Sequence, residues 1–572
     1  MLWFLRDYPL ATLILRALTL AFDALFIGGL FFHSILLGAP FKAPQRAQRV
    51  ERAGLSGEKS SYSFSETDFF QKSQALLRIS ALGLATAQVG FILLDTAILS
   101  STTGLPFTAF FTANYFLAGV VLVAAAILFL AVRRFGSPTN PLWLLFIPLL
   151  LYSTVWTSHA ASRLEYRALL IVLTALHQLA VAFWIGSLPY LWLFLETQDR
   201  NKSTTAATVR RYSFVAVISV AVLVFSGVCA ARFYTQSWSA VYGTGYGFVL
   251  IEKSILLAGL LLFAAGSFLL LRNRRIQPSW LLRIARFSEV EIGIGFTIIL
   301  AAASLSAQPP AVDLVQNRLT LPEIAARMAP VPPRFETPPL SAMPTLPPLG
   351  RQIRQEALSP DDIQHANNRV ERAWSEYNHH WAGIIVFAAG LLALLGKWKR
   401  IPWARNWPLA FLGLAVFLFF RADPESWPLG PRGFWASFYN PEDLLHRLSI
   451  LLILSFVGFE WGVQTHRLRS PRAALVFPAV CAIGGALLLT HNHSLGNVKE
   501  ELLTNISHAG IAICAVFAGW SRWLEVRSSA PAMSSRPAPS RPAPSRLTLA
   551  AARLWPVFLM AIGLILLNYR ES

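Results

Sequence analysis

Fourteen runs of mostly apolar residues, separated by polar connections, constrain this chain more than any other feature. They cover residues 10–38, 75–99, 108–132, 141–157, 168–195, 212–234, 247–271, 290–307, 379–396, 407–420, 444–463, 473–490, 505–524 and 551–568. A helix that crosses a bilayer needs about 20 mostly apolar residues. The pattern predicts an all-α, polytopic helical integral membrane protein with about 14 transmembrane helices, arranged as eight and then six. The runs at 141–157, 407–420 and 473–490 are short or bounded by proline.

The composition agrees with a chain that lies mainly in lipid. Hydrophobic residues make up 55% and charged residues 14%, against roughly 45–50% and 25% in soluble domains. The formal charge of +19 would suggest nucleic acid in a soluble protein, but basic residues in a membrane protein gather in cytoplasmic loops. The expected partner is therefore the lipid bilayer, and no nucleic-acid partner is expected. No nucleotide-binding or hydrolase motif occurs in the sequence, so we expect no enzyme.

The basic residues set the predicted orientation. One set of alternate connections holds 31 of the 49 Lys and Arg residues, and the excess of basic residues marks the cytoplasmic side. An even number of helices then places both termini outside. The first run lacks a basic flank before it and is too long for a signal-peptide core, which predicts a retained helix.

The connections divide the chain into five predicted segments. These are an eight-helix region (1–307), a Pro-rich outside loop (308–378), the helices of the C-terminal half (379–526), a low-complexity cytoplasmic linker (527–550), and a last helix with its tail (551–572). Proline-rich segments favour extended backbone. We therefore expect the loop to be an extended cover rather than a folded domain.

Histidine is the residue type that suggests a metal site. With the predicted orientation, nine of the 11 histidines lie on the outer side. Imidazole suits copper, zinc, iron or nickel, and converging helix ends could bring several rings into one cavity. The candidates at outer helix ends and hairpins are His159, His379, His380, His446, His491, His493 and His508. The alternative for each is an exposed or interfacial polar residue.

His177 differs from the others because it lies about ten residues into a predicted helix, roughly 15 Å deep. A polar side chain inside the membrane is costly, so it indicates function by default. The alternative is a histidine hydrogen-bonded to a neighbouring helix. Glu252, Lys253 and Glu291 raise the same question.

The segment around His177 resembles a known family. The sequence His177-Gln-Leu-Ala-Val-Ala-Phe-Trp184-Ile-Gly186-Ser-Leu-Pro189 is similar to the signature helix of the bacterial copper resistance protein D (CopD) family. The resemblance extends over about 155–305, through Ser158-His159-Ala160, Arg211-Tyr-Ser213, Thr244-Gly-Tyr246-Gly247, Lys253 and Glu291. The six-helix C-terminal half marks the chain as a longer member.

This resemblance implies a multi-pass protein of the bacterial inner (plasma) membrane that acts in copper transport or copper resistance. Both termini would then be periplasmic, and a periplasmic copper-binding protein of the CopC type would be a partner. The implied ligand is a copper ion without an organic cofactor. The chain has only five methionines, which argues against a Met-lined copper(I) path.

Two other functions remain open at this stage. A membrane redox protein holding haem b needs two axial ligands at matched depth, and only His177 is clearly deep. A non-catalytic docking or sensing subunit would receive a copper carrier through the loop 308–378.

Overall fold

The computed structural model describes most of the chain. The described ranges are 8–37, 64–133, 139–198, 203–272, 277–338, 360–398, 400–424, 426–439, 441–490, 499–529 and 546–570. The chain is divided into two compact units, Met1–Gln316 (unit 1) and Asn317–Ser572 (unit 2). The boundary between them lies inside the predicted loop 308–378.

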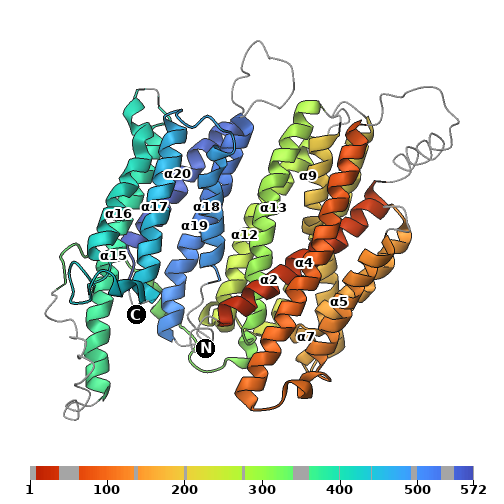
Figure 1. Cartoon of the computed structure of the whole chain (residues 1–572), viewed down its shortest axis with the longest axis horizontal. Helices are drawn as coiled ribbons and strands as arrows, with labels where there is room; N and C mark the ends of the chain where they lie inside the picture. Colours follow the sequence, from red (N-terminus) through yellow and green to blue (C-terminus); the bar gives the residue numbers. More distant parts are fainter. Residues whose placement is uncertain are drawn as a thin grey trace. The chain divides into compact units, whose positions relative to one another are not determined.

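Unit 1 is built from helices that follow the apolar runs of the first half (Figure 1). Its main elements are α2 (Tyr8–Phe31) with the π-helical turn η1 (Phe32–Leu36), α4 (Phe64–Thr103), α5 (Asn114–Val132), α6 (Phe146–Trp156), α7 (His159–Ser162), α8 (Arg167–Val181), the π-helical turn η6 (Ala182–Gly186), α9 (Leu188–Thr197), α10 (Ser203–Thr235), α11 (Trp238–Gly243), α12 (Gly245–Leu271), α13 (Pro278–Ala307) and η7 (Ala311–Asp313). Helix α2 runs obliquely past α4 and also packs on η6 and α13.

Unit 2 contains α14 (Leu321–Met328), α15 (Pro360–Leu395), η9 (Pro402–Leu409), α16 (Ala410–Arg421), η10 (Ala436–Tyr439), α17 (Pro441–Gln464), α18 (Val476–Leu488), α19 (Lys499–Ser529) and α20 (Arg546–Leu567). Helix α20 packs between α15 and α19, and α18 packs on α19 (Figure 1). Small residues allow these close approaches. A Cβ on Gly563 of α20 would meet the backbone of Phe387 in α15 at 2.5 Å, as expected for packing between helices in a membrane.

The predicted fold class is confirmed. Among the described residues, 12 helices are long and apolar enough to cross a membrane, and two shorter apolar helices span Pro141–Trp156 and Ala473–Leu488. These two helices coincide with the predicted runs 141–157 and 473–490, which are short or bounded by proline. The third short run, 407–420, is extended by the preceding turn and forms part of the span Pro402–Arg421.

The loop 308–378 differs from the extended cover that its prolines predict. Helix α14 forms inside it, and α15 begins at Pro360, well before the predicted start at 379. Thr320 and Glu323 form a capping box at the start of α14, and Glu323 also pairs with Lys499 at 2.8 Å. The Lys499 ammonium, with the hydrogen bonds from Thr320, lowers the pKa of Glu323 to about 2. The apolar-run criterion cannot find such helices because they are polar.

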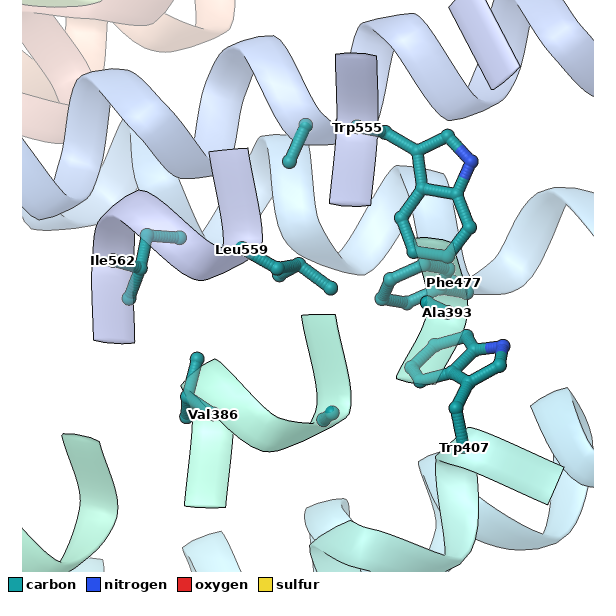
Figure 2. Close-up of a cluster of buried hydrophobic side chains, with 9 residues drawn as sticks. Val386, Ala393, Trp407, Phe477, Trp555, Leu559 and Ile562 are labelled. Carbon is teal, nitrogen blue, oxygen red and sulfur yellow. The ribbon is translucent and has the colours of Figure 1, made fainter. Parts of the chain in front are cut away.

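An aromatic cluster forms the core of unit 2. Trp407, Phe477 and Trp555 meet with ring centroids 5.3–5.7 Å apart, and Val386 and Leu559 extend the cluster along α15 and α20 (Figure 2). Aromatic side chains bury large areas and prefer such tilted pairs. The cluster joins η9, α18 and α20, which are far apart in the sequence.

A network of four charged side chains adjoins this core. Glu525 accepts from Lys397 at 2.6 Å, from Arg522 at 2.7 Å and from the Trp555 indole at 2.7 Å. Arg522 also donates to Glu460 at 3.2 Å. Two positive and two negative charges therefore compensate one another, which is how ionisable groups are tolerated inside a membrane protein.

Candidate functional site

The helix that carries His177 is held against α2 at two glycines. A Cβ on Gly28 would lie 2.5 Å from the nitrogen of Ser187, and a Cβ on Gly186 would lie 2.6 Å from the carbonyl carbon of Ala24. Both distances are far inside van der Waals contact. The two backbones therefore touch at the π-helical turn η6, and only glycine fits at this crossing.

Tyr212 of α10 fixes the same turn from another direction. Its hydroxyl donates to the peptide oxygen of Trp184 at 2.9 Å. A π-helical turn interrupts the regular ladder of backbone hydrogen bonds and often marks a functional position. Tyr212 and η6 are both buried, so this bond sets the position of α10 relative to the turn that follows His177.

His177 lies in the last part of α8 and faces α10. Its Nδ1 is 3.2 Å from Ser226 Oγ, and this hydroxyl donates to the peptide oxygen of Val222 at 2.7 Å. Because the hydroxyl proton is used there, the hydroxyl oxygen accepts from Nδ1–H. This assigns the neutral tautomer in which Nε2 carries the lone pair. A Cβ on Gly227 would be 3.2 Å from His177 Cε1, so the glycine leaves room for the ring.

Ionisable side chains accompany His177 inside unit 1. Lys253 of α12 is half-buried. Glu252, the preceding residue, is buried, and its Oε2 has no hydrogen-bond partner among the described residues. Glu291 of α13 accepts from Ser267 at 3.1 Å.

His159 lies at the start of α7, near the end of α10. Its ring packs edge-on to Tyr234 with centroids 6.5 Å apart, and its Nε2 has no hydrogen-bond partner among the described residues. Burial, followed by the charges of Arg16 and Arg163, lowers the pKa of His159, and the peptide oxygens of Leu305 and Gln308 offset part of that effect. The ring is thus neutral near pH 7, the form that binds metal.

His33, the other histidine inside an apolar run of the first half, uses both ring nitrogens in hydrogen bonds. Nδ1 is 2.8 Å from the peptide oxygen of Gly29, and Nε2 is 3.1 Å from Ser73 Oγ. An axial haem ligand needs one of these nitrogens. The geometry of His33 therefore gives no support to the haem alternative.

Three histidines of unit 2 surround Tyr569. The His379 ring stacks on Tyr569 at 3.8 Å, and the His508 ring centroid is 6.0 Å from it. His380 Nδ1 accepts from the peptide N–H of Arg334 at 2.7 Å, so its Nε2 donates to the peptide oxygen of Tyr569 at 2.9 Å. Both ring nitrogens of His380 thus connect backbone segments, which is a structural role in this conformation.

His446 has a different neighbour. Its Nδ1 is 2.5 Å from Asp423 Oδ1, and its side chain is 42% exposed. His491 and His493 lie outside the described residues. Within the ranges that the structure describes, no three His, Cys, Asp or Glu side chains form a metal-binding group. Among the described candidates, His379, His380 and His508 lie together around Tyr569, without metal-ligand geometry.

The sequence did not identify Tyr212 and Ser226 as site residues. Tyr212 stands in the quoted segment Arg211-Tyr-Ser213, but no sequence pattern predicts which carbonyl it reaches. Ser226 is 49 residues from His177. Only the pairing of helices brings them together.

The helices and their buried ionisable groups define a polytopic, all-α membrane protein. Residues 206–305 match the family model described as copper resistance protein D. The copper transport protein CutJ of Bacillus subtilis (strain 168) is 33% identical over 177 residues, which is 31% of this chain and 31% of that relative. The alignment thus spans about a third of the curated relative's length. No solved structure matches the chain.

The match of residues 206–305 to the copper resistance protein D family agrees with the resemblance found in the sequence. The matched residues run from α10 through α12 into α13 and include Tyr212, Ser226, Lys253 and Glu291. His177 and the signature helix precede the match, as does His159. The matched region therefore supplies Ser226 and Gly227, which lie against His177 from α10.

Proposed function

We propose that this chain handles copper as cargo, in copper transport or copper resistance, and that unit 1 carries the path through the membrane. The observation that carries the proposal is the contact between His177 and Ser226. It joins the deep histidine of the signature helix to the copper resistance protein D region of residues 206–305. The name of the relative CutJ, a copper transport protein, supports the same class of function.

The chemistry of the His177 position suits a transient copper ligand. Ser226 holds Nδ1–H and thereby leaves the Nε2 lone pair as the metal-binding atom. Outer partners that orient a ligating imidazole in this way are typical of metal sites.

The remaining parts of the proposal concern the outer side. His159, His379, His446, His491, His493 and His508 would collect the ion from the periplasm of a bacterial inner membrane, with both termini on that side. His380 belonged to the predicted set, but both of its ring nitrogens already hold backbone segments together. A CopC-like periplasmic protein is the proposed donor of copper.

Metal analysis of the purified protein tests the proposal. The full chain is expressed with copper and iron in the medium and purified in detergent, and both metals are measured per chain. We expect copper and no stoichiometric iron, and a reduced copper content in His177→Asn. Leu176→Ala is the matched control because Leu176 is exposed on the same helix. Stoichiometric iron with a haem spectrum and no copper would contradict the proposal.

A further inference from the structure

The connection between α16 and α17 in unit 2 folds around buried polar side chains. Asp443 accepts from Ser426 Oγ at 2.6 Å and from Arg432 Nη1 at 2.7 Å. Arg447 donates to the peptide oxygens of Phe419 and Trp427 at 3.0 and 3.1 Å. The two arginines and Asp443 therefore have partners that account for their positions.

Asp423, in the same connection, does not fit this pattern. Its carboxylate is only 7% exposed, and Oδ1 contacts His446 Nδ1, but Oδ2 is buried and has no hydrogen-bond partner among the described residues. Buried polar atoms without a partner are costly and rare. A group that neutralises Oδ2 is therefore expected at this place.

A second buried oxygen that lacks a hydrogen-bond partner within the described ranges belongs to Asn378, whose amide contacts the residue before Asp423. Asn378 of α15 donates its amide to the peptide oxygen of Ala422, the residue before Asp423, at 3.0 Å. The amide oxygen of Asn378 is buried and also lacks a hydrogen-bond partner in the described part of the chain. Asn378 of α15 and Asp423 of the connection are thus linked through Ala422, and each has a buried acceptor oxygen without a donor among the described residues.

The surroundings favour a cation as the missing group. Helix α16 ends at Arg421, so its last carbonyl groups place partial negative charge near Asp423. Carboxylate, amide oxygen and imidazole are together suited to a divalent metal ion of borderline hardness. The positive charges of Arg432 and Arg447 are already directed to Asp443 and to peptide oxygens.

We propose that Asp423, His446 and Asn378 form a binding site for a divalent transition-metal ion. In this structure the Nδ1–H of His446 donates to the carboxylate oxygen Oδ1 of Asp423. The metal ion displaces this proton to solvent and is also coordinated by Asp423 Oδ2 and Asn378 Oδ1, with water completing the shell. The ring of His446 is 42% exposed, so it can shift outward by the small amount that a bridging ion needs and leaves a route from solvent.

The existence of this site does not depend on the proposed function, but the identity of its ion as copper does. A site with one imidazole and two oxygen-bearing side chains is weaker than a closed structural site. It is therefore suited to collecting an ion and releasing it again.

Metal titration of the full chain in detergent tests this inference. Copper(II) and zinc(II) are titrated separately into the wild type, Asp423→Asn and His446→Ala. Asp68→Asn is the control because it removes a partly exposed carboxylate that pairs with Lys72 four residues away. We expect one equivalent of metal to bind the wild type and the control at least about tenfold more tightly than either site variant. For copper(II), pulsed electron paramagnetic resonance should lose one imidazole nitrogen coupling in His446→Ala.

The outcomes distinguish whether the site exists from which metal ion it binds. Equal binding by the wild type, Asp423→Asn and His446→Ala would overturn the inference and leave the pair as a hydrogen bond. Binding of zinc but not copper at these residues would support the site and count against copper as its ion. If Asp423→Asn fails to fold, as judged by size-exclusion chromatography, Asn378→Ala and His446→Ala decide the question, since they leave the carboxylate in place.

Discussion

The crossing of α2 with the π-helical turn η6 gives a prediction whose size follows from the structure. In Gly186→Ala, the new Cβ would lie 2.6 Å from the carbonyl carbon of Ala24, whereas ordinary contact begins at 3.4 Å. The peptide oxygen of Ala24 lies closer still, so the two backbones must separate by more than about 0.8 Å, a gap at which each atom contact loses a quarter to a half of its attraction or more. Overpacking costs about 1–3 kcal/mol and alanine regains at most about 1 kcal/mol in helix propensity. We expect a net loss of about 2 kcal/mol in the free energy of unfolding.

Unfolding of the purified protein in mixed micelles of a mild detergent and dodecyl sulfate, followed by tryptophan fluorescence, measures this loss. The matched control is Gly413→Ala in α16, where no atom lies within 4 Å of the added Cβ. The control should be unchanged or stabilised by up to about 1 kcal/mol. If Gly186→Ala is as stable as the control, the backbone contact does not hold α2 against the signature helix, and the reasoning fails.

Three further predictions concern other contacts. The pKa of His159 is lowered in the folded chain, so as the pH falls the unfolded chain takes up the proton first. The free energy of unfolding should therefore decrease as the pH drops below about 6.5. His159→Gln should flatten this dependence when unfolding is measured from pH 7.5 to 5. Glu525→Gln should cost about 3 kcal/mol by breaking a buried network, whereas Asp68→Asn should cost under about 1 kcal/mol. Tyr212→Phe should lose about 1 kcal/mol with the bond to Trp184, and equal stability in the same assay would contradict that role.

The helical framework was predictable because length and hydropathy decide whether a segment can cross a bilayer. All predicted runs coincide with helices of the described chain, and the family resemblance was confirmed over residues 206–305. Helix ends were less predictable. Helix α13 begins at Pro278 rather than near 290 because Arg286 pairs with Glu196 and Glu289, which lets charged residues extend a helix beyond its apolar part.

The candidate site was predictable only in part. The depth of His177 follows from its place in an apolar run, but its partner Ser226 depends on how α8 and α10 pack. His380 looked like a metal ligand in the sequence, yet Arg334 and Tyr569 engage both of its ring nitrogens. Histidine spacing cannot distinguish these cases, because the deciding contacts come from residues up to 189 positions away.

Copper flux through the purified chain in proteoliposomes tests the central claim most directly. A copper-sensitive dye inside the vesicles would report entry of copper through the wild type, His177→Asn and Leu176→Ala, with protein-free vesicles as the baseline. Our account predicts flux above that baseline for the wild type and Leu176→Ala, and at least a tenfold slower flux for His177→Asn. Flux equal to the baseline for the wild type, tested in both directions of the copper gradient, would contradict copper transport by this chain.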